Sequence, residues 1–156
     1  YYITSPIIMY LLENDADIDE IVVMVQKEAA ERICAGAGTK QTGALSIAVE
    51  YRAEADILFN VSKECFTPSP KVNSAVIKLT LRKEKQNIQN EKMFFRVVRA
   101  AFSQRRKTAV SSQMAISKSE LAKIFEEENI SATIRPEAMS MEDFEKVANR
   151  IDNLGC

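Results

Sequence analysis

The first eighty or so residues alternate between helical and extended hydrophobic patterns. Thr4 or Ser5 followed by Pro6 is typical of a helix start, with a hydroxyl N-cap and a proline in the first turn, and this helix should run to about residue 13. Residues 21–25 form a short apolar run with several β-branched side chains, which predicts a strand buried on both faces, as in a parallel sheet. Residues 27–34 then predict a helix that is ended by two glycines.

The next stretch contains one ambiguous segment and two clearer strands. Residues 45–51 satisfy both a helical and an extended pattern. Residues 55–61 and 74–81 predict strands that together read as a hairpin, because apolar and polar side chains alternate in the second one. The polar residues that follow, from Lys83 to Asn90, have the composition of a linker.

Beyond this linker the pattern is helical throughout. Apolar residues between Met93 and Phe102 recur at spacings of three and four, which predicts one buried helix face. Ser117 should begin a second helix with a capping box, and Ser140 should cap a last one after Pro136 breaks the chain. The pattern therefore predicts an α/β unit over residues 1–83, a linker over 84–90 and a small helical domain over 91–156.

The segment from Phe66 to Val76 reads Phe-Thr-Pro-Ser-Pro-Lys-Val-Asn-Ser-Ala-Val and combines features that rarely occur together. Each proline fixes its own φ and favours extended geometry in the residue before it, so the loop should be stiff. A rigidly displayed Phe66 near Lys71 suits a nucleotide base with its phosphate. Taken alone, the motif is more often a proline-rich turn before a strand, with the phenylalanine in the core.

Composition narrows the possible chemistry. The chain has no histidine, which excludes Ser-His-Asp and Cys-His triads and any histidine-ligated metal within it. Its cysteines, Cys34, Cys65 and Cys156, are far apart and fit neither a zinc site nor a disulfide framework, so we expect no metal and a reducing cytoplasm. No apolar run approaches the ~20 residues that span a membrane. The glycines at 36 and 38 lack the spacing of a phosphate-binding P-loop.

Charge is unevenly distributed although the net charge is only −1. No acid interrupts a basic stretch made of Arg96, Arg99, Arg105, Arg106 and Lys107. Such a local patch on a neutral protein can bind phosphate while the acidic C-terminal helices face solvent. An ordinary solvated helix face is the alternative.

The whole chain resembles the C-terminal part of the ribosomal RNA adenine dimethyltransferases. Tyr1 stands where the family has the tyrosine of an Asn-Leu-Pro-Tyr motif. Residues 66–76 match Phe-x-Pro-x-Pro-Lys-Val-x-Ser-Ala-Val, and residues 102–108 match Phe-x-Gln-Arg-Arg-Lys-Thr. Methylases that confer antibiotic resistance by modifying large-subunit RNA share the first of these two motifs. The second one, with the acidic C-terminal helices, favours the small-subunit enzyme.

The resemblance implies a fold, a reaction and a cofactor. The fold would be the C-terminal part of a Rossmann-like methyltransferase sheet, followed by a small all-helical domain. The reaction would dimethylate two adjacent adenines of small-subunit rRNA with S-adenosylmethionine. The cofactor would be bound mainly by an N-terminal half that is missing here, which agrees with a helix–strand alternation that begins without a leading strand. We therefore expect no cofactor-binding residue in this chain and no activity from it alone.

The resemblance also assigns roles to individual residues. Tyr1 and Phe66 would stack on the two faces of the target adenine. Lys71 would meet a phosphate, with an ordinary solvated lysine as the alternative, and the basic stretch would follow the RNA backbone without reading sequence. Because consecutive helical residues point in different directions, Arg99, Arg106 and Lys107 would form that phosphate track, and Arg105 would pack against the α/β part.

The expected partner is small-subunit rRNA within an assembling ribosomal subunit, bound by a monomeric cytoplasmic protein without a membrane segment or metal. A non-catalytic rRNA-binding module for ribosome assembly is the alternative from another functional class.

Overall fold

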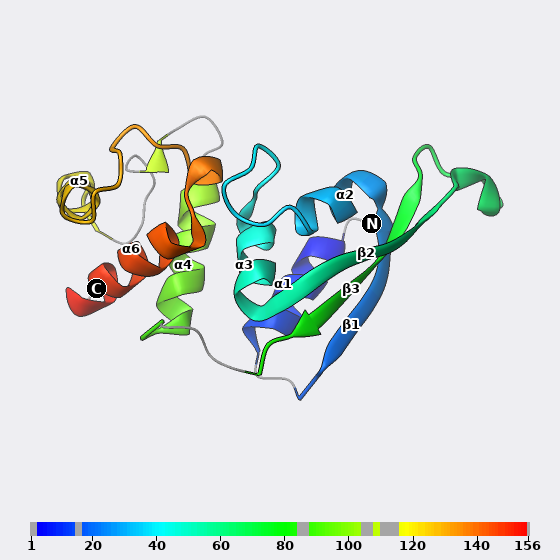
Figure 1. The fold of residues 1–156 in the computed structure, drawn as a ribbon, viewed down its shortest axis with the longest axis horizontal. Coiled ribbons are helices and arrows are strands. Elements are labelled where there is room, and N and C mark those ends of the chain that lie inside the picture. Colours follow the sequence, from blue (N-terminus) through cyan, green and yellow to red (C-terminus); the bar gives the residue numbers. More distant parts are fainter. Residues whose placement is uncertain (1–2, 15–16, 84–87, 104–107, 110–115, 156) are drawn as a thin grey trace.

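The computed structural model describes residues 3–14, 17–83, 88–103, 108–109 and 116–155 (Figure 1). Its centre is a three-stranded sheet in the order β1-β3-β2, with β1 at Glu20–Gln26, β2 at Ala53–Val61 and β3 at Ser74–Leu81. The middle strand is antiparallel to both neighbours. Consequently β1 and β2 run parallel to each other, and the predicted hairpin of the second and third strands is confirmed.

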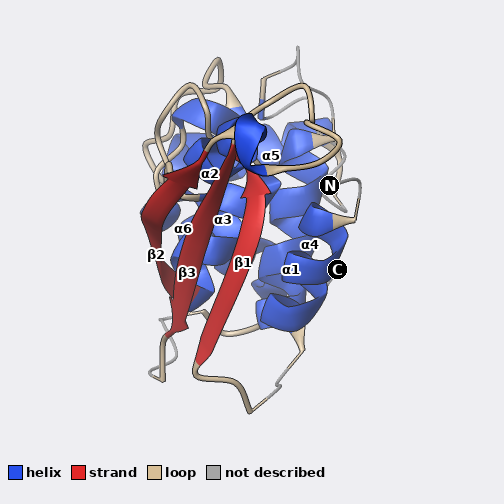
Figure 2. Ribbon diagram, turned by 90° about the vertical axis from the view of Figure 1, so that its right-hand side faces the viewer, coloured by secondary structure: helices blue, strands red, loops and turns tan. Residues whose placement is uncertain are grey.

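The prediction that the first strand is buried on both faces was wrong. Ile21 and Val25 are buried, but Val22 is 56% exposed and Met24 is 44% exposed. Within the described residues β1 pairs only with β3 and in antiparallel orientation, so it is an edge strand of this sheet. The helices of the described ranges cover one face of the sheet, and Figure 2 looks onto the other face with the helices behind the strands.

Three helices belong to the α/β part: α1 at Thr4–Glu13, α2 at Lys27–Ile33 and α3 at Ala44–Arg52. The ambiguous residues 45–51 are thus helical. The predicted hydroxyl cap of α1 was wrong, because Ile3 holds the N-cap position and no side chain caps that end. Gly36 and Gly38 after α2 both have positive φ, which glycine adopts without a steric penalty.

The C-terminal part contains α4 at Glu91–Phe102, α5 at Lys118–Glu127 and α6 at Met141–Asn153. Ser117 and Ser140 cap α5 and α6 with reciprocal capping boxes, as predicted. Short 3₁₀ turns lie at Lys63–Cys65 and Pro136–Ala138. In Figure 1 these helices lie at one end of an elongated molecule and the sheet at the other. Every helix in the described ranges is too short or too polar to span a lipid bilayer.

The two parts meet where α3 packs against α4. The buried Tyr51 ring lies 4.6 Å from the Phe94 ring and 5.7 Å from the Phe95 ring, measured between centroids. The Tyr51 hydroxyl donates a 3.0 Å hydrogen bond to Glu91, and the Arg52 guanidinium pairs with the same carboxylate at 2.7 Å. One continuous hydrophobic core therefore extends from the sheet into the C-terminal helices.

Candidate functional site

The proline-rich motif lies at one end of the sheet, in the loop between β2 and β3 (Figure 1). The carboxyl ends of β1 and β2 are at this same end, because both strands run antiparallel to β3 and the motif leads into the start of β3. Ligands of open α/β sheets bind outside the carboxyl ends of the strands. This end of the sheet is therefore the candidate functional site.

Asn73 connects the separate segments of the site. Its backbone carbonyl accepts a 3.0 Å hydrogen bond from the amide of Lys27, the first residue of α2. Its side-chain oxygen accepts a 3.0 Å hydrogen bond from the amide of Lys63. The Ser69 hydroxyl donates to the Lys63 carbonyl at 2.9 Å. The loop is thus tied at several points, both to itself and to the start of α2.

Phe66 follows directly after the Lys63–Cys65 turn and is half-buried. Its amide donates a 3.3 Å hydrogen bond to the Lys63 carbonyl. The peptide bond between Thr67 and Pro68 is cis. Because hydrogen bonds anchor its loop, Phe66 is held in place, and it is only partly buried, as a stacking residue needs.

A pocket of about 450 Å³ lies beside this loop. Three lysines from three segments line it: Lys27 at the start of α2, Lys63 in the 3₁₀ turn and Lys71 just before β3. The remaining lining residues are Gln26, Glu28, Glu31, Val72 and Asn73. The fold thus places two further ammonium groups around the lysine that the motif singled out.

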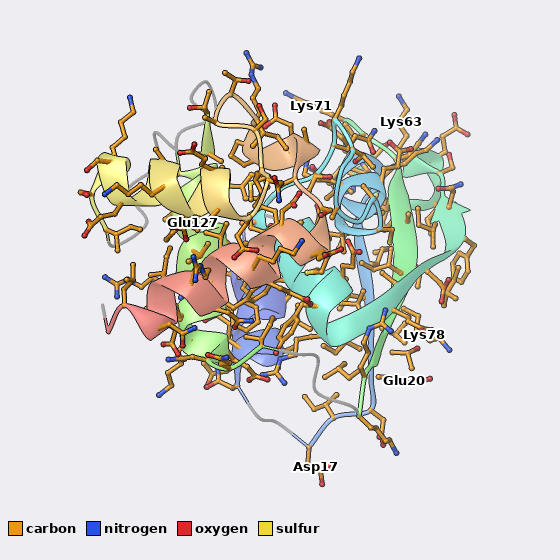
Figure 3. The ribbon with its side chains drawn as sticks, turned by 60° about the vertical axis from the view of Figure 1, so that its left-hand side comes forward. Asp17, Glu20, Lys63, Lys71, Lys78 and Glu127 are labelled. Atoms are coloured by element: carbon orange, nitrogen blue, oxygen red, sulfur yellow. The ribbon has the colours of Figure 1, made fainter. Side chains whose placement is uncertain are left out.

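None of these three lysines forms an ion pair with a carboxylate of the described residues, whereas Lys78 on β3 and the two basic residues just after β3 do. Lys78 pairs with Glu20 at 3.3 Å, and Lys83 pairs with Asp19 at 3.5 Å. Figure 3 shows Lys63 and Lys71 at one end of the molecule and the Lys78–Glu20 pair further along the sheet. The candidate site thus contains three lysines that have no ion-pair partner among the described residues.

The predicted phosphate track lies elsewhere, and only one of its residues is described. Arg99 is exposed on α4 and forms an ion pair with Glu13 at the end of α1. Tyr1, Arg105, Arg106 and Lys107 lie outside the described residues. The structure therefore does not test whether these residues contact RNA, and their roles stay predictions.

Arg99 lines a larger cleft of about 930 Å³ between α1, α2, the loop before α3 and the end of α4. Its charged residues are mostly paired with each other, since Arg32 contacts Glu28 at 3.1 Å and Arg99 contacts Glu13. This cleft is therefore close to neutral, in contrast to the lysine-lined pocket.

Cys34 and the acidic residues of the described ranges do not form a reactive thiol or a metal site. Burial raises the pKa of the Cys34 thiol, and the nearby Asp56 carboxylate raises it further, which disfavours a reactive thiolate. Within the described ranges, no group of three or more acidic or cysteine side chains is arranged to hold a metal ion.

Sequence reasoning missed Lys27, Lys63 and Asn73 as parts of the site. Asn73 lies inside the recognised motif, so its position was an available signal. Lys63 lies three residues before the motif and Lys27 lies far from it in sequence. Only the pairing of β1 with β3 brings the start of α2 beside the motif.

The described residues thus form an α/β fold whose candidate site lies at the carboxyl ends of β1 and β2. The family model of the ribosomal RNA adenine dimethylases matches residues 1–153. A ribosomal RNA small subunit methyltransferase A of Lachnoclostridium phytofermentans is 47% identical over 97% of this chain and 54% of its own length. Its counterpart from Clostridioides difficile is 45% identical with the same two coverages. The chain belongs to the ribosomal RNA adenine dimethylase family and spans about half the length of these curated relatives.

Solved structures agree on the fold. A dimethyladenosine transferase from Plasmodium falciparum superposes with a TM-score of 0.79 at 23% identity, over 99% of this chain and 65% of that one. The 23S rRNA methyltransferase ErmE superposes with a TM-score of 0.65 at 19% identity, over 97% of this chain and 62% of that one. At these identities the two structures support the fold alone.

Proposed function

We propose that the whole protein is an S-adenosylmethionine-dependent dimethyltransferase for two adjacent adenines of small-subunit rRNA. The observation that carries this proposal is the position of Phe66 and its anchored loop at the carboxyl ends of β1 and β2. Relatives that are 47% and 45% identical are named as small-subunit methyltransferases, which favours that RNA over the large-subunit RNA of ErmE. Such work on RNA belongs in the cytoplasm during ribosome assembly.

The chemistry asks the protein mainly to position the base. The exocyclic amine of adenine is a weak nucleophile because its lone pair is delocalised into the ring, and S-adenosylmethionine supplies an activated methyl group for direct displacement. The base must leave its stack and be held in line with that methyl group. Stacking on an aromatic ring contributes about 1–3 kcal/mol per base. Phe66 would hold one face of the adenine and Tyr1 the other.

The rest of the catalytic domain would join this chain along β1. This strand is an edge of the sheet in the described residues, and two of its apolar side chains are exposed. The curated relatives are almost twice as long as the matched region. We propose that β1 pairs with a further strand in the whole protein, and that the cofactor site lies in that added part. Residues 1–156 alone would then neither bind S-adenosylmethionine tightly nor transfer its methyl group.

The substitution Phe66→Ala in the full-length protein tests the proposed function. We expect methyl transfer to small-subunit rRNA to fall at least ten-fold while RNA affinity changes little, because one stacked base contributes less to binding than many phosphate contacts. Turnover is measured with radiolabelled cofactor, and affinity by filter binding.

Phe66→Tyr, which keeps an aromatic ring, is the matched control and should retain most activity. Equal losses of turnover and affinity in Phe66→Ala, together with a lowered melting temperature, would show that the ring serves the core. Large-subunit RNA in parallel reactions distinguishes the alternative substrate, and RNA binding without any methylation would favour a non-catalytic assembly module.

A further inference from the structure

We propose that Lys27, Lys63 and Lys71 together form a binding pocket for a phosphate of the RNA strand next to the flipped adenine. The inference deepens the proposed function, because the RNA is taken to be the methylation substrate. It adds two residues, Lys27 and Lys63, that no sequence motif marked.

The geometry of the pocket is fixed by the backbone around it. Asn73 accepts hydrogen bonds from the amides of both Lys27 and Lys63, each at 3.0 Å. Lys71 precedes Asn73 by two residues in the same loop. The three lysine backbones are therefore held around one residue, although they come from different elements. All three lysines line a space of about 450 Å³, which falls within the usual size range of ligand pockets.

The charge of the pocket favours an anion. Its three lysines have no carboxylate partner among the described residues, while Lys78, Arg82 and Lys83 further along the sheet are all paired. Two acidic residues, Glu28 and Glu31, also line the pocket. Glu28 is already paired with Arg32 at 3.1 Å, so its charge is partly compensated. Glu31 adds one negative charge, so the lining as a whole stays positively charged.

The lining suits a phosphate better than a base. No aromatic side chain contributes to the pocket, and Val72 is its single large apolar residue. Lysine ammonium groups bind phosphate as compact charges with several donors each. Phe66 is three residues from Lys63 and bonded to its carbonyl. The loop therefore offers a ring for a base and, beside it, cations for the backbone phosphate of the same strand.

The test is the double substitution Lys27→Gln with Lys63→Gln in the full-length protein. Binding of a small-subunit rRNA fragment is measured by fluorescence anisotropy at several salt concentrations. We expect the Kd to rise about ten-fold and the slope of log K against log salt to become shallower by about one, since losing one phosphate contact removes nearly one released counterion. Both side chains are exposed, so folding should be unaffected, and a thermal melt verifies this.

Two control variants make the outcome specific. Lys78→Gln with Lys83→Gln removes the same charge from ion-paired positions on the sheet and should leave the slope unchanged. Lys27→Arg with Lys63→Arg keeps the charge and should restore most of the affinity. The proposal would be overturned if Lys27→Gln with Lys63→Gln left RNA affinity and the salt slope unchanged. It would also be overturned if Lys78→Gln with Lys83→Gln changed both quantities by the same amounts.

The proposal and the proposed function can fail separately. If the wild-type protein methylates small-subunit rRNA but the Lys27 and Lys63 variant binds it normally, the phosphate pocket is wrong and the enzyme activity stands. If the wild-type protein does not methylate RNA but the salt slope still becomes shallower, the pocket stands and the activity is wrong. Weaker binding of S-adenosylmethionine with unchanged RNA binding would assign the lysines to the cofactor carboxylate and overturn the proposal.

Discussion

At the scale of single residues, Asn73 has the most influence on the candidate site. One short side chain and its backbone carbonyl bond the amides of two lysines that lie far apart in sequence. An amide is suited to this position because its oxygen accepts a hydrogen bond without adding a negative charge. A carboxylate there would supply the same acceptor but would also attract the neighbouring ammonium groups.

We predict that Asn73→Ala lowers methyl transfer more than it lowers stability. The side-chain bond to the Lys63 amide is lost, which costs about 1 kcal/mol, and the loop that displays Phe66 becomes less fixed. The backbone bond to Lys27 remains, so the variant should fold. Melting temperature and single-turnover methylation are the two measurements.

Asn73→Asp is the matched variant, because it keeps the acceptor oxygen. Its loop geometry should survive, while its added charge should weaken RNA binding. If Asn73→Ala methylates RNA at the wild-type rate, the side-chain hydrogen bond does not position the loop.

A second residue-scale prediction concerns Tyr51 at the junction of α3 and α4. Burial raises the pKa of its phenol, and the hydrogen bond to the Glu91 carboxylate raises it further. The folded-state pKa is thus above the unfolded value of about 10. The contribution of the neutral phenol to stability is therefore fully present below about pH 10 and is lost as the pH rises toward the folded-state pKa.

Replacing Tyr51 by phenylalanine should remove this pH dependence. At neutral pH the variant should be less stable by about 1 kcal/mol because the bond to Glu91 is gone. The difference from wild type should shrink above about pH 10, because ionisation of the phenol in the unfolded state then lowers the stability of the wild-type protein. Urea unfolding at neutral and alkaline pH measures it, with Tyr10→Phe, at a 68% exposed side chain, as control. A difference that stays constant with pH would contradict the prediction.

At the scale of elements, the helix N-termini show which capping motifs can be predicted reliably from sequence. The capping boxes at Ser117 and Ser140 were predicted from sequence and are present. The expected hydroxyl cap of α1 is absent. The helix already begins at Thr4, so Thr4 and Ser5 lie inside its first turn and Ile3 holds the N-cap position. A capping box specifies two reciprocal bonds, whereas a hydroxyl before a proline specifies only one.

We predict that Ser140→Ala destabilises the protein by about 1 kcal/mol. Its hydroxyl accepts a 3.1 Å hydrogen bond from the Asp143 amide at the start of α6, and alanine leaves this amide without its partner. Ser5→Ala is the control, since Ser5 is exposed in the first turn of α1 and makes no capping bond there. It should change stability by less than about 0.5 kcal/mol. Equal effects in chemical denaturation would contradict the role of the α6 cap.

At the scale of the whole molecule, the β1 edge is where we propose that the sheet continues in the full-length protein. The Lys27 amide bonds the Asn73 carbonyl at 3.0 Å and the Leu81 amide bonds the Asp19 carbonyl at 2.8 Å, which sets the register of β1 against β3. Bonded and non-bonded positions alternate along an antiparallel pair. Residues at odd positions of β1 therefore bond β3, and the backbones of Val22 and Met24 point away from it.

This alternation gives a prediction with an internal control. In residues 1–156 alone, the amides of Val22 and Met24 should exchange quickly with solvent, and those of Ile21, Val23 and Val25 slowly. In the full-length protein the first two amides should become protected, because a further strand pairs with this edge. Hydrogen exchange followed by NMR measures each amide. If Val22 and Met24 stay unprotected in the longer protein, the sheet does not continue through β1.

The sequence by itself determined the family and most of the local elements. The capping boxes, the hairpin strands and the proline-rich motif depend on neighbouring residues, so they were predictable from short windows. The tertiary structure decided which faces are buried and which charges meet. An apolar run such as 21–25 predicts a strand, but its burial depends on partners that the run does not contain. Likewise Arg99 finds Glu13, and Lys27 lies beside Lys63 and Lys71, only because the fold brings distant segments together. Charges that remain unpaired after folding are a property of the whole arrangement, and for this reason the lysine pocket could not be predicted from the sequence.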